Sequence, residues 1–278
     1  MSVLGPILID GVAVPEAEAT ISVLDIGLQR GYGCFESVRS YGGRPFRLAQ
    51  HLARLESSAA IMRMPLPPQA DLEAWVRDRA AEGDCSIRVI VTGGVDAEHP
   101  GVHGRTIVIA SSLPSIPPQI RLQPRVAPWH PDGRVSELTG AKTLSYGPNL
   151  AARLAAVADG FDDALLYSPG GDVLEGPTYS IGWIVGDRFE IPGPELGVLA
   201  GVTSAAVCEV APAAGLEVMP GRYPLSRLLE ADEVVAMSTL RAVRPVVALG
   251  DAILPAGPMA ETLNGLYEQL VAAELGMR

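Results

Sequence analysis

The first 110 or so residues alternate short apolar stretches with glycine-containing turns, a pattern typical of β-hairpins. Residues 3–14 predict one hairpin around Asp10-Gly11, and residues 35–48 predict another around Tyr41-Gly42-Gly43. The glycines supply the positive φ that tight hairpin turns require. Two further stretches are apolar and β-branched enough to form inner strands, residues 86–92 and 106–110.

Between these strands the apolar period changes to that of a helix. Five apolar residues fall on one stripe at helical spacing: Leu48, Leu52, Leu55, Ala59 and Met62. His51, Arg54 and Ser58 lie on a neighbouring face of the same helix. The prolines at 65, 67 and 68 end this helix, and a second amphipathic helix is expected over residues 71–81.

A proline-rich stretch over residues 113–118 separates the two halves of the chain. Clustered prolines continue neither a strand ladder nor a helix, so we place an interdomain linker at residues 114–119. The predicted domains are residues 1–113 and 120–278. In the second half we expect strands at 119–128, 164–167, 179–185, 234–239 and 246–249, and helices at 148–159, 202–214 and 259–275. This mixed order predicts an α/β (α+β) protein of two domains.

Composition narrows the class of protein. The 278 residues are 48% hydrophobic, enough for a substantial core, and carry a net charge of −11. Such a charge argues against binding a nucleic-acid backbone, which favours clustered cations. No apolar stretch approaches the length of a membrane span. Three unevenly spaced cysteines, without a Cys-x-x-Cys pair, suit a reducing compartment. We therefore expect a cytoplasmic protein without a nucleic-acid or membrane partner.

Motifs for metals and nucleotides are weak or missing. His99 and His103 are four residues apart, but Pro100 and Gly101 between them interrupt the helix that would bring both rings together. No Gly-x-Gly-x-x-Gly or Walker-type loop follows a strand. The sequence therefore predicts no metal site, dinucleotide site or nucleoside triphosphate site.

Lys142 is the only lysine of the chain, and all other basic side chains are arginines or histidines. A neutral amine can condense with an aldehyde, whereas a guanidinium cannot. Any carbonyl–amine chemistry through a side chain therefore has one candidate, Lys142.

Several other segments offer groups for an anion or for a buried cation. Gly201-Val202-Thr203 begins a predicted helix, where backbone N–H groups and the helix dipole favour an anion. Ser238-Thr239 ends an apolar strand and adds hydroxyl groups, while Arg54 offers a guanidinium fork. Glu175 is either a turn residue or the partner of a buried cation. Each signal is weak by itself.

Taken in order, these motifs resemble the class IV (fold type IV) pyridoxal-phosphate enzymes, over nearly the whole chain. The N-terminal half contributes Asp25-x-Gly27, Gly31-x-Gly33-x-Phe35-Glu36 and His51-x-x-Arg54-Leu55. The C-terminal half contributes Lys142-Thr-Leu-Ser-Tyr146, Glu175-Gly176, Leu199-Ala-Gly-Val202-Thr203 and Ser238-Thr239. The resemblance implies the D-amino acid aminotransferase-like fold.

The resemblance also implies the cofactor pyridoxal 5′-phosphate (PLP) and a role for each matched residue. Lys142 would hold the cofactor aldehyde as a Schiff base and move the proton of the substrate, and Glu175 would face the pyridine nitrogen. Tyr146 would donate to the phenolic oxygen of the ring, and Leu199 would pack against the ring. The phosphate would be held by Arg54, Val202, Thr203, Ser238 and Thr239. A homodimer with a shared active site is expected.

Two departures from the family pattern concern the substrate. Ser180 stands where the family usually has Asn, and residues 93–100 lack the Arg-x-His carboxylate trap of D-amino acid transaminases. We therefore expect a substrate carboxylate to bind Arg30 and Arg241, with Phe35 also at the substrate.

The expected activity is transfer of an amino group between a D-amino acid, or an (R)-amine, and a 2-oxo acid. The alternative is an aminodeoxychorismate lyase that releases 4-aminobenzoate and pyruvate, because the same lysine serves both reactions. An L-branched-chain aminotransferase is less favoured, since its characteristic loop is not evident, and a non-catalytic binding module is the remaining reading.

Overall fold

A computed structural model describes residues 2–130 and 136–277 of the chain. Packing contacts divide these residues into two units. Unit 1 comprises Met1–Ser115 and Ala141–Tyr146, and unit 2 comprises Ile116–Gly140 and Gly147–Arg278. The break after Ser115 falls within the predicted linker at residues 114–119. The domain limits stay a prediction, because packing contacts alone do not establish independently folding domains.

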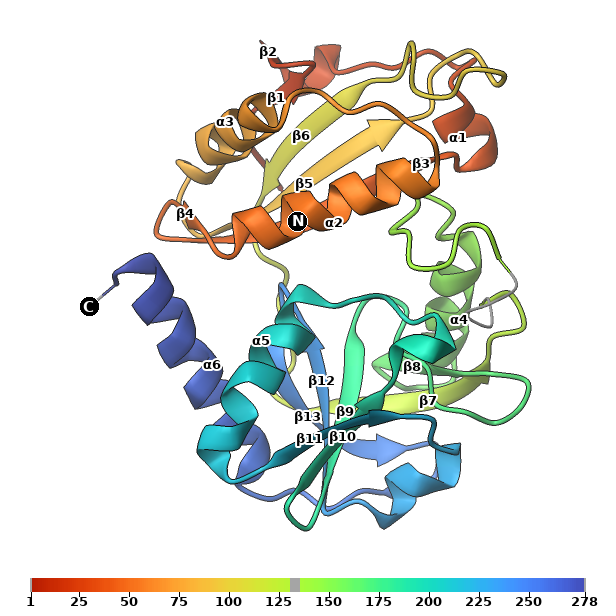
Figure 1. Cartoon of the computed structure of the whole chain (residues 1–278), viewed down its shortest axis with the longest axis vertical. Coiled ribbons are helices and arrows are strands. Elements are labelled where there is room, and N and C mark those ends of the chain that lie inside the picture. The colour runs from red at the N-terminus through yellow and green to blue at the C-terminus, as the bar shows by residue number, and fades with distance from the viewer. Residues whose placement is uncertain (1, 131–135, 278) are drawn as a thin grey trace. The chain divides into compact units, whose positions relative to one another are not determined.

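Unit 1 is built on an antiparallel sheet of six strands in the order β2-β1-β6-β5-β3-β4 (Figure 1). The strands are β1 (Val3–Ile9), β2 (Val12–Val14), β3 (Gly33–Tyr41), β4 (Arg44–Pro45), β5 (Cys85–Thr92) and β6 (Thr106–Ser111). Alternation along β3 directs Cys34, Glu36, Val38 and Ser40 to one buried face. This face carries one charged residue among neutral ones.

Two helices cover that buried face of the first sheet (Figure 1). They are α2 (Leu48–Ile61), which packs on β3, and α3 (Gln69–Ala80), which packs on β4, β5 and β6. The apolar stripe predicted for α2 is confirmed, because Leu48, Leu52, Leu55 and Ala59 are all buried. The structure adds that His51 and Ser58, on the polar side of that stripe, are buried as well.

Unit 2 contains a mixed sheet with the strand order β11-β10-β9-β12-β13-β7-β8, and β14 pairs with β13. The pairs β10–β11, β13–β7 and β7–β8 are parallel, and the others are antiparallel. The strands are β7 (Ile120–Val126), β8 (Asp163–Tyr167), β9 (Ser180–Val185), β10 (Arg188–Pro192), β11 (Glu217–Gly221), β12 (Glu233–Ser238), β13 (Ala242–Leu249) and β14 (Ala252–Ile253).

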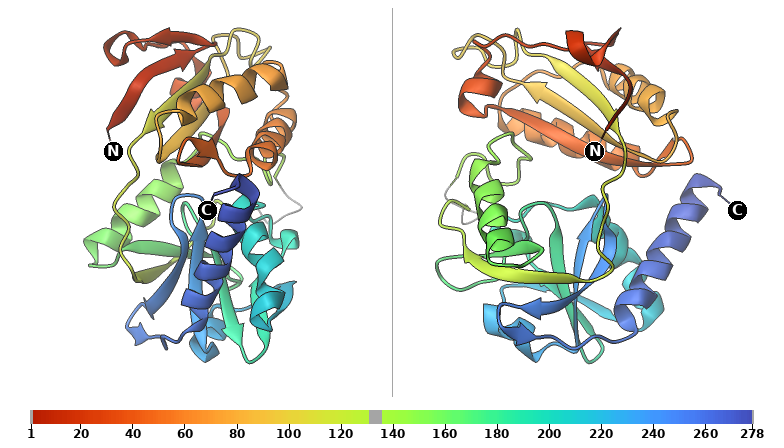
Figure 2. Two further views of the ribbon diagram at one scale, coloured as in Figure 1. Left: turned by 90° about the vertical axis from the view of Figure 1, so that its left-hand side faces the viewer. Right: turned by 180° about the vertical axis from the view of Figure 1, so that it is seen from behind.

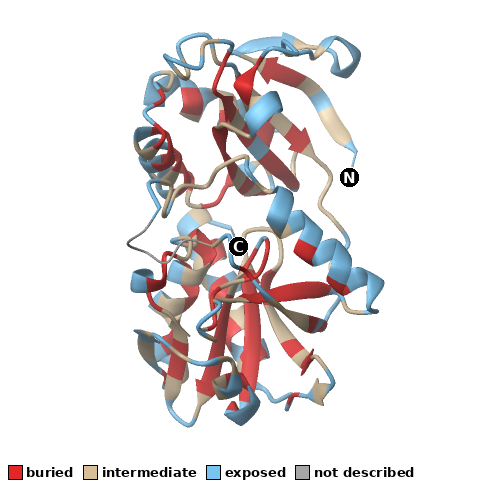
Figure 3. Cartoon of the chain, turned by 90° about the vertical axis from the view of Figure 1, so that its right-hand side faces the viewer, coloured by how far each residue is buried: buried red, intermediate tan, exposed pale blue. Residues whose placement is uncertain are grey.

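Helices α4 (Gly147–Ala158), α5 (Val202–Val210) and α6 (Met259–Leu275) pack on this sheet (Figure 2). Its central strands are buried along most of their length (Figure 3). One core cluster surrounds Trp183, Leu165 and Leu228, and a second, between α4 and β8, contains Ala152, Ala156 and Leu166. α5 packs against β12 and against α6.

The structure corrects several predicted limits. The second hairpin returns through a strand of two residues, β4, because the chain turns into α2 at Leu48. α5 ends at Val210, since Pro212 lies in a following 3-10 turn at Ala211–Ala214. The sequence did not indicate α1 (Ile26–Arg30), whose N-cap Asp25 accepts a hydrogen bond from the amide of Gly27 at 2.7 Å, nor β10 and β11. Within the described residues, no helix is both long and apolar enough to span a bilayer.

Candidate active site

The segment that carries Lys142 is held against the first half of β3, within unit 1. The amide of Phe35 donates to the carbonyl of Lys142 at 3.0 Å, and the amide of Leu144 donates to the carbonyl of Gly33 at 2.8 Å. A Cβ atom at Gly33 would lie 2.6 Å from Cδ1 of Leu144, and a Cβ at Gly31 would lie 2.9 Å from Oγ of Ser145. Gly31, the C-cap of α1, and Gly33, the first residue of β3, thus permit the close approach of the lysine segment.

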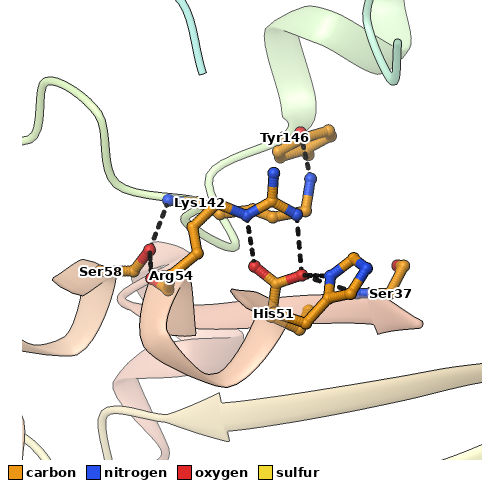
Figure 4. A network of polar contacts seen from close by, with 7 residues as sticks. Ser37, His51, Arg54, Ser58, Lys142 and Tyr146 are labelled. Carbon is orange, nitrogen blue, oxygen red and sulfur yellow. Dashed lines mark hydrogen bonds and ion pairs between the residues drawn. The ribbon is translucent and has the colours of Figure 1, made fainter. Parts of the chain in front are cut away.

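The amine of Lys142 lies among aromatic and hydroxyl groups. Its Nζ is 3.4 Å from the hydroxyl oxygen of Tyr146 and 4.5 Å from the ring centroid of Phe35. The rings of Phe35 and Tyr146 meet edge to face at 5.2 Å. Figure 4 shows the amine directed towards the hydroxyl group of Tyr146. Phe35 and Tyr146, predicted to serve the substrate and the cofactor, are therefore brought together with Lys142.

A buried ionic cluster joins β3 to α2 beside the lysine (Figure 4). The carboxylate of Glu36 is fully buried and accepts hydrogen bonds from Nε of Arg54 at 2.7 Å and from one Nη at 2.8 Å. Nδ1 of His51 lies 2.8 Å from the same carboxylate. Burial and a bidentate carboxylate fix the orientation of the Arg54 guanidinium.

Charge within this cluster is set by burial and by its hydrogen bonds. Burial alone would raise the pKa of Glu36, but the bonds from Arg54 and His51 outweigh it and lower the pKa to about 2. Burial lowers the pKa of His51, and Glu36 opposes that shift. Burial, with a contribution from Glu36, raises the pKa of Cys34 to about 12, which keeps this thiol protonated. The cluster therefore contains an ionised carboxylate and a fixed guanidinium.

Arg88 is a second cation at the Phe35 ring, which the sequence did not indicate. It lies on β5 opposite Ser37, and its guanidinium carbon is 4.8 Å from the ring centroid of Phe35. Arg88 is exposed in the single chain, and partial desolvation of its guanidinium lowers its pKa, while Tyr146 opposes the shift. The guanidinium of Arg88 and the amine of Lys142 thus both contact one phenyl ring.

Glu175, which lies in unit 2, has two hydrogen-bond partners of its own. The amide of Leu199 and Nε2 of His130 are each 3.3 Å from its Oε1. The structure thus brings together two predicted cofactor contacts, Glu175 and Leu199, and adds His130, which the sequence did not indicate.

The predicted phosphate contacts of unit 2 lie at the start of α5 and the end of β12. Gly201 occupies the N-cap of α5 and has no side chain to accept from the first amides, while Val202 and Thr203 are buried. A Cβ at Gly201 would lie 2.6 Å from Oγ of Ser180. β12 ends at Ser238, whose hydroxyl accepts from the amide of Arg241 at 3.3 Å, and Thr239 follows in the turn.

The two arginines predicted for the substrate carboxylate differ in environment. Arg30 is exposed at the end of α1. Arg241 donates through Nη2 to the buried carboxylate of Asp163 at 2.7 Å and stacks on the ring of Tyr179. A substrate would compete with Asp163 for Arg241, and both roles stay predictions.

Comparison with known proteins decides the family. The amino-transferase class IV family matches residues 33–249, which is most of the chain. The chain belongs to this family of PLP-dependent enzymes. The predicted cofactor, PLP, and the predicted fold type IV are therefore both confirmed.

Relatives within the family have different activities. A putative branched-chain-amino-acid aminotransferase of Methanocaldococcus jannaschii is 28% identical, over 95% of this chain and 94% of the relative. A bifunctional aminodeoxychorismate lyase / D-amino acid transaminase of Mycobacterium tuberculosis is 26% identical, over 96% and 99%. Among solved structures, a fold IV-transaminase from Curtobacterium pusillum is similar with a TM-score of 0.86. That protein is 28% identical, and the match covers 95% of this chain and 91% of the other. These names leave the substrate unresolved.

The described residues fit the cofactor chemically. In unit 1, the amine of Lys142 suits the cofactor aldehyde and the guanidinium of Arg54 suits a phosphate. In unit 2, the carboxylate of Glu175 suits the ring nitrogen and the uncapped start of α5 suits a phosphate. The individual residue roles stay predictions. Among residues 2–130 and 136–277, no group of three or more His, Cys, Asp or Glu side chains could hold a metal ion.

Five residues of the site were given no role by the sequence. Arg88 and His130 were not indicated, whereas Glu36, His51 and Ser58 lay in a motif or on a helix face without an assigned role. The sequence positions of Glu36 and Ser58 could have indicated that both side chains are buried. Glu36 falls on the apolar alternation of β3, and Ser58 follows His51 and Arg54 at helical spacing. An inward carboxylate on a strand beside an inward arginine on the next helix indicates a buried pair.

Proposed function

We propose that this enzyme is an aminotransferase that exchanges an amino group between an amino acid and a 2-oxo acid. The observation that carries the proposal is the arrangement around Phe35, whose ring centroid lies 4.5 Å from the Lys142 amine and 4.8 Å from the Arg88 guanidinium carbon. An amino acid has a carboxylate one carbon away from its reacting amine. Lys142 as the base and Arg88 as the cation, both at the Phe35 ring, are suited to the amine and the carboxylate of an amino acid.

The residues divide the chemistry between them. PLP, when bound, supplies an electron sink for negative charge at the substrate α-carbon. Lys142 takes and returns the proton of that carbon at its Nζ. Tyr146 orients the amine through its hydroxyl group, and Phe35 excludes water from one side. Glu175 would accept a hydrogen bond from the ring nitrogen of the cofactor, and Arg54, fixed by Glu36, would hold its phosphate.

Arg88 binds the substrate carboxylate in this proposal, in preference to Arg30 and Arg241. The Arg88→Gln variant should raise KM for amino acids about 10- to 100-fold, since a charge-assisted bond contributes about 1.5–3 kcal/mol. The KM for an (R)-amine, which has no carboxylate, should change little. An equal rise in KM for amino acid and amine would contradict this role, and Arg30→Gln and Arg241→Gln would then be tested in the same way.

For the donor we propose D-amino acids. One relative is named as a D-amino acid transaminase, and the loop characteristic of L-branched-chain enzymes is not evident in the sequence. Single-turnover reactions with the D and L enantiomers of alanine and of leucine, followed by the change in cofactor absorbance, separate the classes. A faster reaction with L-leucine than with D-alanine and D-leucine would reject the D proposal and leave the aminotransferase proposal standing.

The alternative activity is the aminodeoxychorismate lyase reaction, which the name of the same relative supports. Its discriminating test is release of pyruvate and 4-aminobenzoate from aminodeoxychorismate without a 2-oxo acid. Product formation without an amino acceptor would favour the lyase.

The attachment of the cofactor has a direct test, because the chain has one lysine. Borohydride reduction of the purified protein with PLP, followed by digestion, should yield a pyridoxyl group on the peptide that contains Lys142. The Lys142→Arg variant should yield none and should be inactive. An unmodified Lys142 peptide in the wild type would overturn the proposed role of this residue and would favour the alternative that the protein is a non-catalytic binding module.

We further propose a homodimer, in the cytoplasm, with an active site completed by the partner. The support is an apolar stripe on α4, where Leu150, Leu154 and Val157 are 51%, 59% and 48% exposed in the single chain. Light scattering should give twice the chain mass, and Leu154→Arg should lower it. A monomer that retains full activity would refute the shared site.

A further inference from the structure

The strongest unassigned feature beside the lysine is a fully buried serine, Ser58 on α2. Its hydroxyl has two partners in different segments of the chain. It donates to the carbonyl of Arg54, one turn earlier, at 2.8 Å, and accepts from the amide of Lys142 at 3.0 Å. Figure 4 shows Ser58 between these two backbones.

The bond to Lys142 is more than the serine itself requires. A helical serine satisfies its hydroxyl by bonding the carbonyl four residues earlier, which Ser58 already does. The second bond spans 84 positions of sequence and satisfies the Lys142 amide. Because the hydroxyl donates on one side and accepts on the other, the chain of bonds runs from Lys142 to Arg54 and each bond polarises the next.

The consequence for Lys142 is that its backbone is held on both sides of the Cα atom. Ser58 fixes its N–H, and the amide of Phe35 fixes its C=O at 3.0 Å. The side chain therefore starts from a defined point and direction. Ser58 also donates to the carbonyl of Arg54, whose guanidinium is held by the carboxylate of Glu36.

We propose that Ser58 is a positioning residue for Lys142, which holds the lysine backbone so that the amine meets the cofactor aldehyde in a reactive geometry. This proposal rests on the proposed function of Lys142 as the cofactor-binding lysine. Ser58 itself touches neither substrate nor cofactor and acts through the lysine amide.

The test measures capture of aldehydes by the apo protein. Ser58→Ala removes one oxygen from a helix and should fold. Ser40→Ala is the matched control, because Ser40 is equally buried and donates to the carbonyl of Ala80 but has no bond to the lysine segment. Each protein is mixed with PLP, or with pyridoxal, which lacks the phosphate, then reduced with borohydride at timed intervals. The modified Lys142 peptide is quantified by mass spectrometry.

Ser58→Ala should capture both PLP and pyridoxal about five- to tenfold more slowly than wild type, whereas Ser40→Ala should stay within about twofold. Ser58→Thr, which keeps the hydroxyl and the bond to the preceding turn, should recover most of the rate. Slow capture of PLP with unchanged capture of pyridoxal would overturn the proposal, since it would place the effect of Ser58 on the phosphate contact at Arg54. Equal rates for Ser58→Ala and Ser40→Ala would overturn it as well.

Failure of the proposed function has a separate signature. If wild-type protein acquires no pyridoxyl group on Lys142, the role of the lysine is wrong whatever the variants do. If wild type is modified and Ser58→Ala is modified at the same rate, only the positioning role is wrong.

Discussion

Gly33→Ala tests whether the close approach between β3 and the lysine segment holds the site together. An added Cβ would lie 2.5 Å from the carbonyl oxygen of Val91 and 2.6 Å from Cδ1 of Leu144. Carbon atoms in van der Waals contact are about 3.5–4.0 Å apart, so each side must open by roughly 1 Å. Gly33 has no positive φ, so the effect comes from space alone.

The magnitude follows from which neighbours can move. The Leu144 methyl group can rotate away, but the Val91 oxygen belongs to the backbone of β5 and can move only with that strand. Overpacking of this kind costs about 1–3 kcal/mol of the free energy of unfolding. Displacement of residue 33 also weakens the bond from the Leu144 amide to its carbonyl, so capture of PLP by Lys142 should slow about tenfold, equivalent to ~1.4 kcal/mol.

Urea unfolding, followed by circular dichroism and by tryptophan fluorescence, measures the first effect, and timed borohydride reduction measures the second. The matched control is Gly265→Ala in α6, where an added Cβ meets no atom within 4 Å. That variant should gain about 0.5–1 kcal/mol, because alanine is favoured over glycine inside a helix. If Gly33→Ala is as stable as wild type and captures PLP equally fast, the glycine does not serve the lysine segment. If adding Leu144→Ala restores full stability, the Val91 contact was not limiting.

Three further predictions concern the Glu36 cluster and Gly201. Glu36→Gln should lower the free energy of unfolding by about 3–5 kcal/mol, because it leaves the largely buried guanidinium of Arg54 without its counter-charge. The exposed control Glu56→Gln should change that free energy by less than about 0.5 kcal/mol in the same urea titration. Since Glu36 has a pKa lowered from 4.5 to about 2, its ionised form contributes stability that is present above pH 4.5 and lost towards pH 2. His51, with a lowered pKa, adds in both proteins a loss of stability that begins below pH 6.5. Only wild type has the Glu36 carboxyl, so between pH 4.5 and pH 2 wild type should lose stability more steeply than Glu36→Gln, and parallel curves over that range would count against the cluster. Gly201→Ala should weaken PLP binding, because the added Cβ would lie within 3 Å of one atom, the Ser180 hydroxyl oxygen. Adding Ser180→Ala should restore the affinity for PLP. A double variant that binds PLP as weakly as Gly201→Ala would exclude that contact as the cause.

The local pattern of apolar, glycine and proline residues predicted most of the helices and strands. The hairpins, the apolar stripe of α2 and the breaks at prolines are short-range features, because hairpin turns and helix spacing depend on nearby residues. The lone lysine and its motifs likewise identified the family. Elements were missed where tertiary contacts decide the conformation, as in α1, where Asp25 caps five residues and also accepts a hydrogen bond from Thr92 at 2.6 Å.

The partners of the site residues could not be read from the sequence. Arg241 was expected to bind substrate, but its partner Asp163 lies 78 positions away, on β8. Ser58 and Lys142 are 84 positions apart, and Arg88 meets Phe35 only because β3 and β5 pair in one register. Such contacts depend on strand order and register, which local periodicity does not specify.

The segment of residues 141–146, which bridges to β3 at Thr143, has a practical consequence for anyone who would truncate this protein. A fragment ending at Ser115 would lack the residues that bond the Phe35 amide and the Gly33 carbonyl, and would expose that edge of the sheet to pairing with other copies. Expression of the N-terminal half alone should therefore give aggregates, whereas fusion of the missing hexapeptide through a flexible tether should restore solubility.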